Sequence, residues 1–121
     1  MEPGKKAKAS TIVSGTNTAK AVKSGNLEVF STPMMVALME EAACNCLNLE
    51  SGQSSVGTYI AVEHLAASAL GAEITATATL TKVDGRKLTF ELSAHEGEKE
   101  IGNGTHVRFV IDAEKFMSKL K

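Results

Sequence analysis

A few polar side chains lie in segments of the sequence that are otherwise apolar, and their types suit proton transfer. They are Thr32, Glu40, Glu41, Asn45 and His64. A carboxylate and an imidazole held close together can act as a general base, a general acid or a nucleophile. Taken singly, Glu40 or Glu41 is more simply interpreted as part of a solvated helix edge, and His64 as a hydrogen-bonded core histidine. The functional interpretation therefore depends on what brings them together.

Other kinds of site have little support in the sequence. His95 adjoins a predicted turn and His106 lies in a predicted strand, which makes both weaker candidates. Cys44 and Cys46 lie two residues apart in a predicted helix, so they point in nearly opposite directions and cannot chelate one metal ion. HExxH, CxxC, GxSxG, GxGxxG and phosphate-loop motifs are all missing. We therefore expect no metal site and no bound cofactor.

The clearest predicted element is a helix that carries Thr32 and both glutamates. Ser31 can cap its first amides, and Pro33 fits its first turn. Apolar residues then recur at spacings of three and four to about residues 47–49 and cover more than one stripe of the helix. Such a helix must be enclosed by the rest of the chain.

Alternating segments predict that strands enclose this helix. The strictest alternation ends at the hairpin signal Asp84-Gly85, and Gly102 and Gly104 indicate a bulge or close backbone packing in the last strand. The segment 58–67 is interpreted as a strand, with a helix as the alternative. The predicted strands are residues 10–13, 58–67, 73–83, 87–94 and 100–112.

Length and composition set the fold class. The chain has 121 residues, of which 43% are hydrophobic and 22% charged, so we expect one domain over residues 1–121. Its order of elements predicts an α+β fold with one central helix wrapped by a curved antiparallel sheet. Ala76 and Ala78 are small enough to let the helix lie close to the sheet. Residues 1–10 are expected to form a flexible arm.

Charge and hydropathy argue against several partners. The net charge of -1 provides no general attraction to nucleic acid or to an anionic membrane. No apolar stretch approaches the roughly 20 residues of a membrane helix, and Met1–Ser10 lacks the apolar centre of a secretory signal. We expect a cytoplasmic protein that binds neither nucleic acid nor membrane.

The segment VFSTPMMVALME, residues 29–40, resembles the helix start of the hot-dog-fold thioesterases related to fluoroacetyl-CoA thioesterase. The likeness continues in order through SVGT, VEHLAA, LG, VDGR, SAH and IGNGTH. Each piece alone is weak, but the ordered set is specific. The sequence differs at residues 21–26, which contain no aromatic side chain where the fluoroacetyl-selective member covers its site with aromatics. This difference argues against a fluoroacetyl substrate.

The resemblance implies a hot-dog homodimer that hydrolyses a small acyl-CoA thioester, with coenzyme A as part of the substrate. It assigns the catalytic constellation to Thr32, Glu40 and His64. It also suggests that Gly57 offers a backbone N–H near the thioester carbonyl, and that Arg108 lies near the site. Two other functions remain open: an acyl-CoA-binding module without activity, and a hot-dog hydratase of enoyl thioesters.

Helix geometry places a condition on this constellation. Thr32 and Glu40 are separated by about 12 Å along a helix, so they cannot share a hydrogen bond within one chain. We therefore expect each site to combine Thr32 of one subunit with Glu40 of the other.

Overall fold

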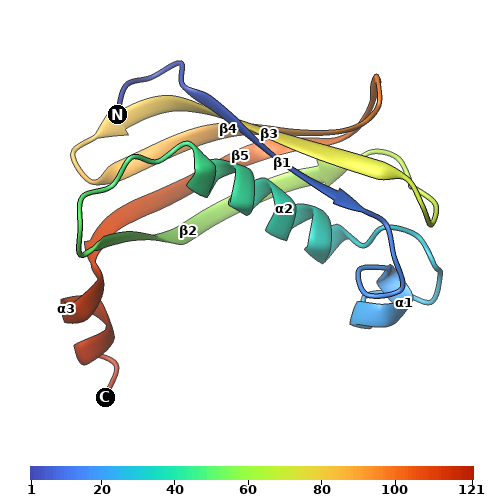
Figure 1. Ribbon diagram of the computed structural model, residues 1–121, viewed down its shortest axis with the longest axis horizontal. Helices are drawn as coiled ribbons and strands as arrows, with labels where there is room; N and C mark the ends of the chain where they lie inside the picture. Colours follow the sequence, from blue (N-terminus) through green and yellow to red (C-terminus); the bar gives the residue numbers. More distant parts are fainter.

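A curved antiparallel sheet wraps around one long helix in the computed structural model, which describes residues 1–121 (Figure 1). The five strands lie in the order β1-β3-β4-β5-β2, so β1 and β2 form the two edges. The elements are β1 (Lys6–Ile12), α1 (Ala19–Val22), α2 (Thr32–Asn45), β2 (Gln53–His64), β3 (Glu73–Asp84), β4 (Lys87–Glu96), β5 (Lys99–Asp112) and α3 (Ala113–Ser118). This is the predicted α+β arrangement.

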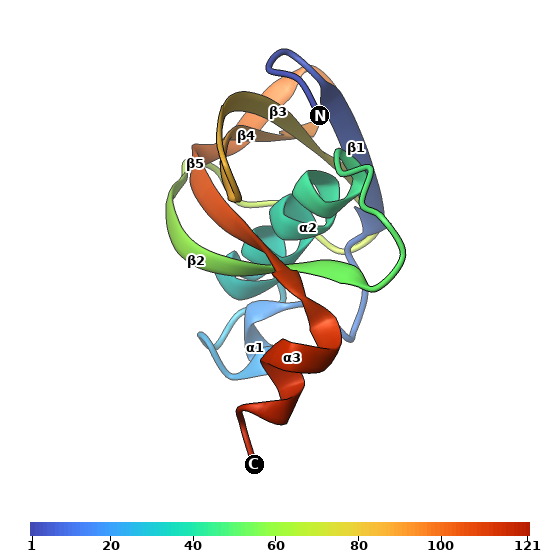
Figure 2. The same cartoon turned by 90° about the vertical axis from the view of Figure 1, so that its left-hand side faces the viewer.

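Helix α2 begins where its capping signal predicts. The Ser31 hydroxyl accepts a hydrogen bond of 3.2 Å from the amide of Met34, and Pro33 lies in the first turn, where no amide donor is needed. The helix ends at Asn45, a little before the predicted residues 47–49. Viewed along its axis, α2 lies inside the curl of the sheet (Figure 2).

The core lies between α2 and the concave face of the sheet. The inward side chains of the helix are fully or almost fully buried: Met35, Leu38, Met39, Ala42 and Ala43. The predicted alternation of the strands is confirmed, because the inner faces of β3 and β4 are buried at Ile74, Ala76, Ala78, Leu80, Leu88, Phe90, Leu92 and Ala94. The alanines on β3 let α2 approach the sheet closely.

Gly102 on β5 lies where the helix and a neighbouring strand both press on the sheet. A Cβ atom there would lie 2.5 Å from the sulfur of Met35 and 3.0 Å from the carbonyl oxygen of Glu63. The pairing of β4 with β5 also shifts beside this glycine. The prediction of a bulge or close backbone packing at Gly102 is therefore confirmed.

Two predictions about the ends of strands need correction. Residues 6–10 are not a free arm, because they lie in β1 and pair with residues 75–79 of β3. Strand β2 begins at Gln53, inside a run of turn-forming residues, because its first residues pair with the end of β5. A short helix, α1, lies in the connection that leads to α2. None of the helices has the length and apolar character needed to cross a bilayer.

Candidate active site

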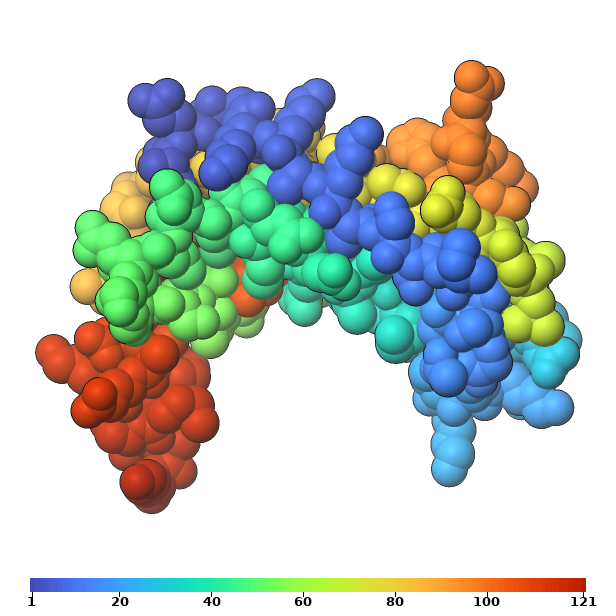
Figure 3. All heavy atoms as spheres, viewed as in Figure 1, coloured from blue at the N-terminus to red at the C-terminus, as the bar shows by residue number.

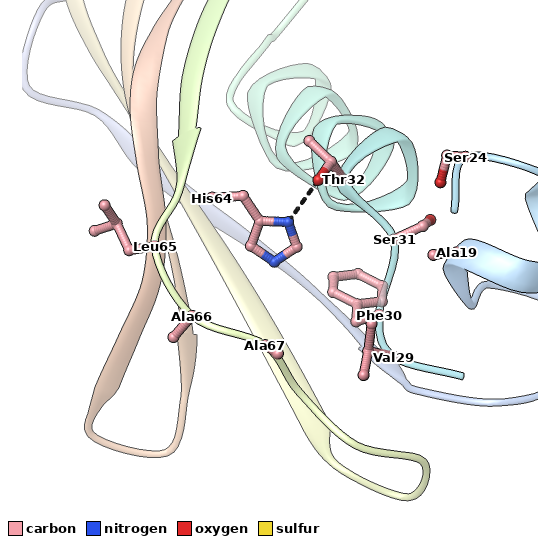
Figure 4. A pocket seen from close by; sticks show the side chains of 10 residues that line it. All are labelled: Ala19, Ser24, Val29, Phe30, Ser31, Thr32, His64, Leu65, Ala66 and Ala67. Atoms are coloured by element: carbon pink, nitrogen blue, oxygen red, sulfur yellow. Dashed lines mark hydrogen bonds between the residues drawn. The ribbon is translucent and has the colours of Figure 1, made fainter. Parts of the chain in front are cut away.

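The first half of the candidate site is a hydrogen bond between helix α2 and the end of strand β2. Thr32 is the first residue of α2, and its hydroxyl lies 2.8 Å from Nδ1 of His64, the last residue of β2 (Figure 4). The side chains are 32 positions apart in the sequence, and only the folding of β2 along the helix brings them together. The structure thus places two of the three predicted catalytic residues side by side.

The second ring nitrogen of His64 faces a cavity and is left without a partner. Nε2 is buried and makes no hydrogen bond, which is costly for a polar atom. The cavity has a volume of about 310 Å³, and it is lined by Ala19, Ser24, Val29, Phe30, Ser31, Thr32, His64, Leu65, Ala66 and Ala67. Burial lowers the pKa of His64 below its ordinary value of 6.5, against a weaker opposing interaction with the Ala66 backbone. The imidazole is therefore neutral near pH 7 and able to take up a proton.

The second half of the candidate site surrounds Glu40, farther along α2. Oε1 of Glu40 lies 3.9 Å from Nη1 of Arg108 and 3.7 Å from Nε2 of His106, and its side chain keeps 38% of its surface exposed. Gly57 lies directly opposite, because a Cβ atom there would approach Oε1 of Glu40 to 2.9 Å. The missing side chain thus makes room for the carboxylate. We call these four residues the Glu40 cluster.

Arg108 is held firmly in the sheet. It is only 8% exposed. Its Nε donates to the hydroxyl of Ser55 at 2.8 Å, and its Nη2 donates to the Ser55 carbonyl at 3.0 Å. The guanidinium is thereby fixed beside the carboxylate of Glu40.

His106 belongs to the Glu40 cluster, although the sequence marked it as a weaker candidate. It is fully buried, and its pKa is lowered mainly by that burial. His106, Arg108 and Val110 alternate along β5 and are all buried, so they share its inner face. Two polar residues on an otherwise apolar strand face are the signal that could have identified them. Glu41, weighed equally with Glu40 from the sequence, is exposed.

Within one chain the two halves remain separate. Glu40 is not among the residues that line the cavity beside Thr32 and His64. A single protomer therefore presents a hydroxyl–imidazole pair at one end of α2 and a carboxylate–guanidinium pair about two turns away. No group of three or more histidine, cysteine, aspartate or glutamate side chains is arranged to hold a metal ion.

Comparison with known proteins gives this geometry a context. Residues 13–114 match the sequence family described as fluoroacetyl-CoA-specific thioesterase. The fluoroacetyl-CoA thioesterase of Streptantibioticus cattleyicolor is 49% identical over 96 residues, which cover 78% of this chain and 69% of that protein. A crystal structure of the fluoroacetyl-CoA thioesterase FlK is 40% identical and superposes with a TM-score of 0.93, covering 99% of this chain and 95% of the other.

A more distant structure supports the same fold. A hot-dog-like protein from Thermanaerovibrio acidaminovorans is 25% identical and gives a TM-score of 0.89, with 99% of this chain and 90% of the other covered. The expected resemblance and the expected hot-dog fold are confirmed. This chain belongs to the fluoroacetyl-CoA-specific thioesterase family, and it is a thioester hydrolase with the hot-dog fold.

Proposed function

We propose that this protein hydrolyses a small acyl-CoA thioester in sites that each span the seam of a homodimer. Each site would combine Thr32 and His64 of one protomer with Glu40 of the other. The observation that carries the proposal is the division of the candidate residues into two half-sites, one at each end of the same stretch of α2 and β2. The half-site at Thr32 has an imidazole with a free nitrogen but no carboxylate. The half-site at Glu40 has a carboxylate, but both nitrogens of its histidine are occupied.

The course of β2 supports this assembly. The strand contacts the Glu40 cluster at Gly57 and the Thr32 hydroxyl at His64, and it is an edge strand with nothing paired on its outer side. Antiparallel pairing with a second β2, centred near residues 60–61, would bring Gly57 opposite the partner's His64. Two-fold symmetry then creates two identical sites, each with a complete set of residues.

The shape of the molecule also accommodates a second copy. One side of the protomer is hollowed between two projections, one formed by α3 and the other by the region of α1 (Figure 3). Near the middle of β2, Tyr59 keeps 57% of its surface exposed. The outer side of this long edge strand has unpaired backbone groups that can pair with a strand of another chain. A second copy seated in this hollow would cover both features.

The chemistry requires a carboxylate, a proton carrier and a donor for the oxyanion. Glu40 either attacks the acyl carbon, expelling the CoA thiolate and leaving a mixed anhydride for water to cleave, or removes a proton from the water that attacks. His64, neutral at pH 7, receives the proton of the attacking water, through Glu40 in the general-base route or directly when water cleaves the anhydride, and passes it to the CoA thiolate. The Thr32 hydroxyl holds its ring in place. We assign the oxyanion donor to the Gly57 amide, a contribution of about 3 kcal/mol in comparable sites.

The size of the cavity supports a short acyl group. The cavity beside His64 has a volume of about 310 Å³, which lies at the lower end of the range for ligand-binding cavities. It is bordered by Phe30, Ala66 and Ala67, so it suits a small apolar chain. Phe30 supplies an aromatic wall, although residues 21–26 supply none. The relatives named for fluoroacetyl-CoA make that thioester one of the substrates to compare.

A thiol-release assay tests the proposal directly. Acetyl-, fluoroacetyl-, phenylacetyl- and longer acyl-CoA substrates are compared, and we expect the highest kcat/KM among the short chains. Glu40→Gln and His64→Ala should each lower kcat by about 100-fold or more, because they remove acid–base groups. Glu41→Gln is the matched control and should retain wild-type turnover. Wild-type turnover in either of the first two variants would contradict the assigned roles.

The same assay separates the alternative functions. Tight binding of acyl-CoA with no thiol released would indicate a binding module. Addition of water to an enoyl-CoA without release of CoA would indicate a hydratase. Either result would replace the proposed hydrolysis.

A further inference from the structure

His106 is a fully buried histidine inside the Glu40 cluster, and hydrolysis as proposed gives it no part. Its Nδ1 lies 2.8 Å from the carbonyl oxygen of Tyr59, and its Nε2 lies 3.2 Å from Nη1 of Arg108. Its ring also packs against Phe90, with 5.9 Å between the ring centroids. Each polar atom of the imidazole therefore has one close partner.

These partners fix the tautomer of the imidazole. A carbonyl oxygen can only accept, so Nδ1 must carry the proton in its bond to Tyr59. A guanidinium can only donate, so Nε2 must accept from Arg108 and remain unprotonated. A doubly protonated ring would set two donors against each other at 3.2 Å. Burial, which lowers the pKa of His106, favours the same neutral form.

The hydrogen bond to His106 is the third one that anchors the Arg108 guanidinium. Ser55 accepts from Nε and Nη2 of the guanidinium, and His106 accepts from Nη1. The same Nη1 lies 3.9 Å from Oε1 of Glu40, so its position decides where the positive charge lies relative to the carboxylate. Without the acceptor at His106, Nη1 would lose the contact that holds it at this place.

We propose that His106 is a positioning residue, whose neutral Nδ1–H tautomer holds the Arg108 guanidinium so that Arg108 orients the carboxylate of Glu40. This inference rests on the proposed function of Glu40 and concerns a residue that acts only through its neighbours. Direct proton exchange between His106 and Glu40 is not part of it, because the 3.7 Å between Nε2 and Oε1 exceeds hydrogen-bonding distance.

Two substitutions separate positioning from packing. His106→Gln keeps an acceptor near Nε2 for Arg108, whereas His106→Asn keeps only a donor near Nδ1 for Tyr59. We expect kcat to fall about 10-fold in His106→Asn, with little change in KM, and to stay within about threefold of wild type in His106→Gln. His95→Asn, on β4, is the matched control and should be unaffected. Equal losses of kcat in both His106 variants would overturn the proposal.

A double-mutant cycle tests the route through Arg108. In an Arg108→Gln background, His106→Asn should lower kcat by less than about twofold further, because the residue that it positions is already gone. Full additivity of the two losses would show that His106 acts independently and would overturn the proposal. Glu40→Gln in the same assay keeps the questions separate: its failure to lower kcat contradicts the proposed function, whatever the His106 variants do.

Nuclear magnetic resonance of the unsubstituted protein provides a test that does not depend on folding of a variant. The ¹⁵N shifts of the His106 ring should report a protonated Nδ1 and an unprotonated Nε2 at pH 7. An imidazolium, or the opposite tautomer with a proton on Nε2, would overturn the proposal even if every variant proved too unstable to assay.

Discussion

Two imidazoles, the half-buried His64 and the fully buried His106, have different neighbours in this molecule. His64 has one hydroxyl partner and one free nitrogen facing a cavity, so its proton can be exchanged. His106 has both nitrogens occupied, by a carbonyl and a guanidinium, so its proton is fixed. Burial lowers the pKa of both rings. Their hydrogen-bond partners, rather than the residue type, therefore distinguish the two rings, and this difference is the basis for proposing that His64 carries a proton and that His106 supports Arg108.

The lowered pKa values of both histidines predict how stability depends on pH. Between the ordinary pKa of about 6.5 and the lower folded values, the unfolded chain binds more protons than the folded one. The free energy of unfolding should therefore fall as the pH decreases below about 6.5, and this decline should end once the pH lies below the folded values.

Urea unfolding at pH 7.5, 6.5 and 5.5 measures this dependence. His64→Asn removes one of the two groups, so its free energy of unfolding should change less over the same interval. Greater stability of the wild-type protein at pH 5.5 than at pH 7.5 would contradict the prediction.

Among the elements, those with strong local signals were predicted best. Helix α2 has a hydroxyl cap and a proline in its first turn, and β3 and β4 alternate strictly about a tight turn at Gly85, whose φ is +61°. Strand β1 was predicted too short, because its lysines resemble a solvated arm. Its pairing with β3 is a contact over long sequence separation, which local patterns do not reveal.

For the candidate site, the sequence predicted which residues take part but not how they group in space. Thr32, Glu40 and His64 were picked out as polar residues in apolar segments, and the resemblance gave them roles. Which of them meet within one chain depends on how β2 runs along α2, and no spacing in the sequence contains that information. His106 was undervalued for the same reason: its neighbours include Tyr59 on β2 and Phe90 on β4, which no local spacing reveals.

Strand β2 approaches helix α2 closely at Gly57, so we expect a side chain at this position to displace the Glu40 carboxylate. Alanine at this position would bring a methyl group to 2.9 Å from Oε1 of Glu40 and 3.3 Å from Nη1 of Arg108. The carboxylate must move, so we expect Gly57→Ala to lower kcat at least about 10-fold. Its thermal midpoint should fall only modestly: the shortest contact is with the flexible end of Glu40, whereas the buried ring of His106, with Cε1 at 3.2 Å, must shift by a few tenths of an ångström.

Steady-state kinetics and thermal unfolding of the same samples check this separation of activity from stability. Gly15→Ala is the matched control, since nothing lies within 4 Å of a Cβ atom there. The prediction is wrong if Gly57→Ala retains wild-type kcat, or if it loses activity only in proportion to unfolding.

At the scale of the whole molecule, the proposed function requires two chains. One protomer carries two incomplete half-sites at opposite ends of the same helix–strand contact, and two-fold pairing along β2 would complete both at once. The particle in solution should then have twice the 12.7 kDa mass of the chain. Light scattering during gel filtration measures this mass, and a monomer at assay concentration would rule out the shared site.

Hybrid dimers test directly whether the residues of one site come from different chains. Glu40→Gln and His64→Ala protomers are each nearly inactive alone, but a mixed dimer would contain one site with both native residues. After denaturation and joint refolding of equal amounts, half of the dimers are mixed, so about a quarter of the wild-type activity should return. The control mixes two differently tagged Glu40→Gln chains and should regain nothing. If both residues acted within one chain, the mixed dimers would also stay inactive, because each chain would still lack one member of its own pair.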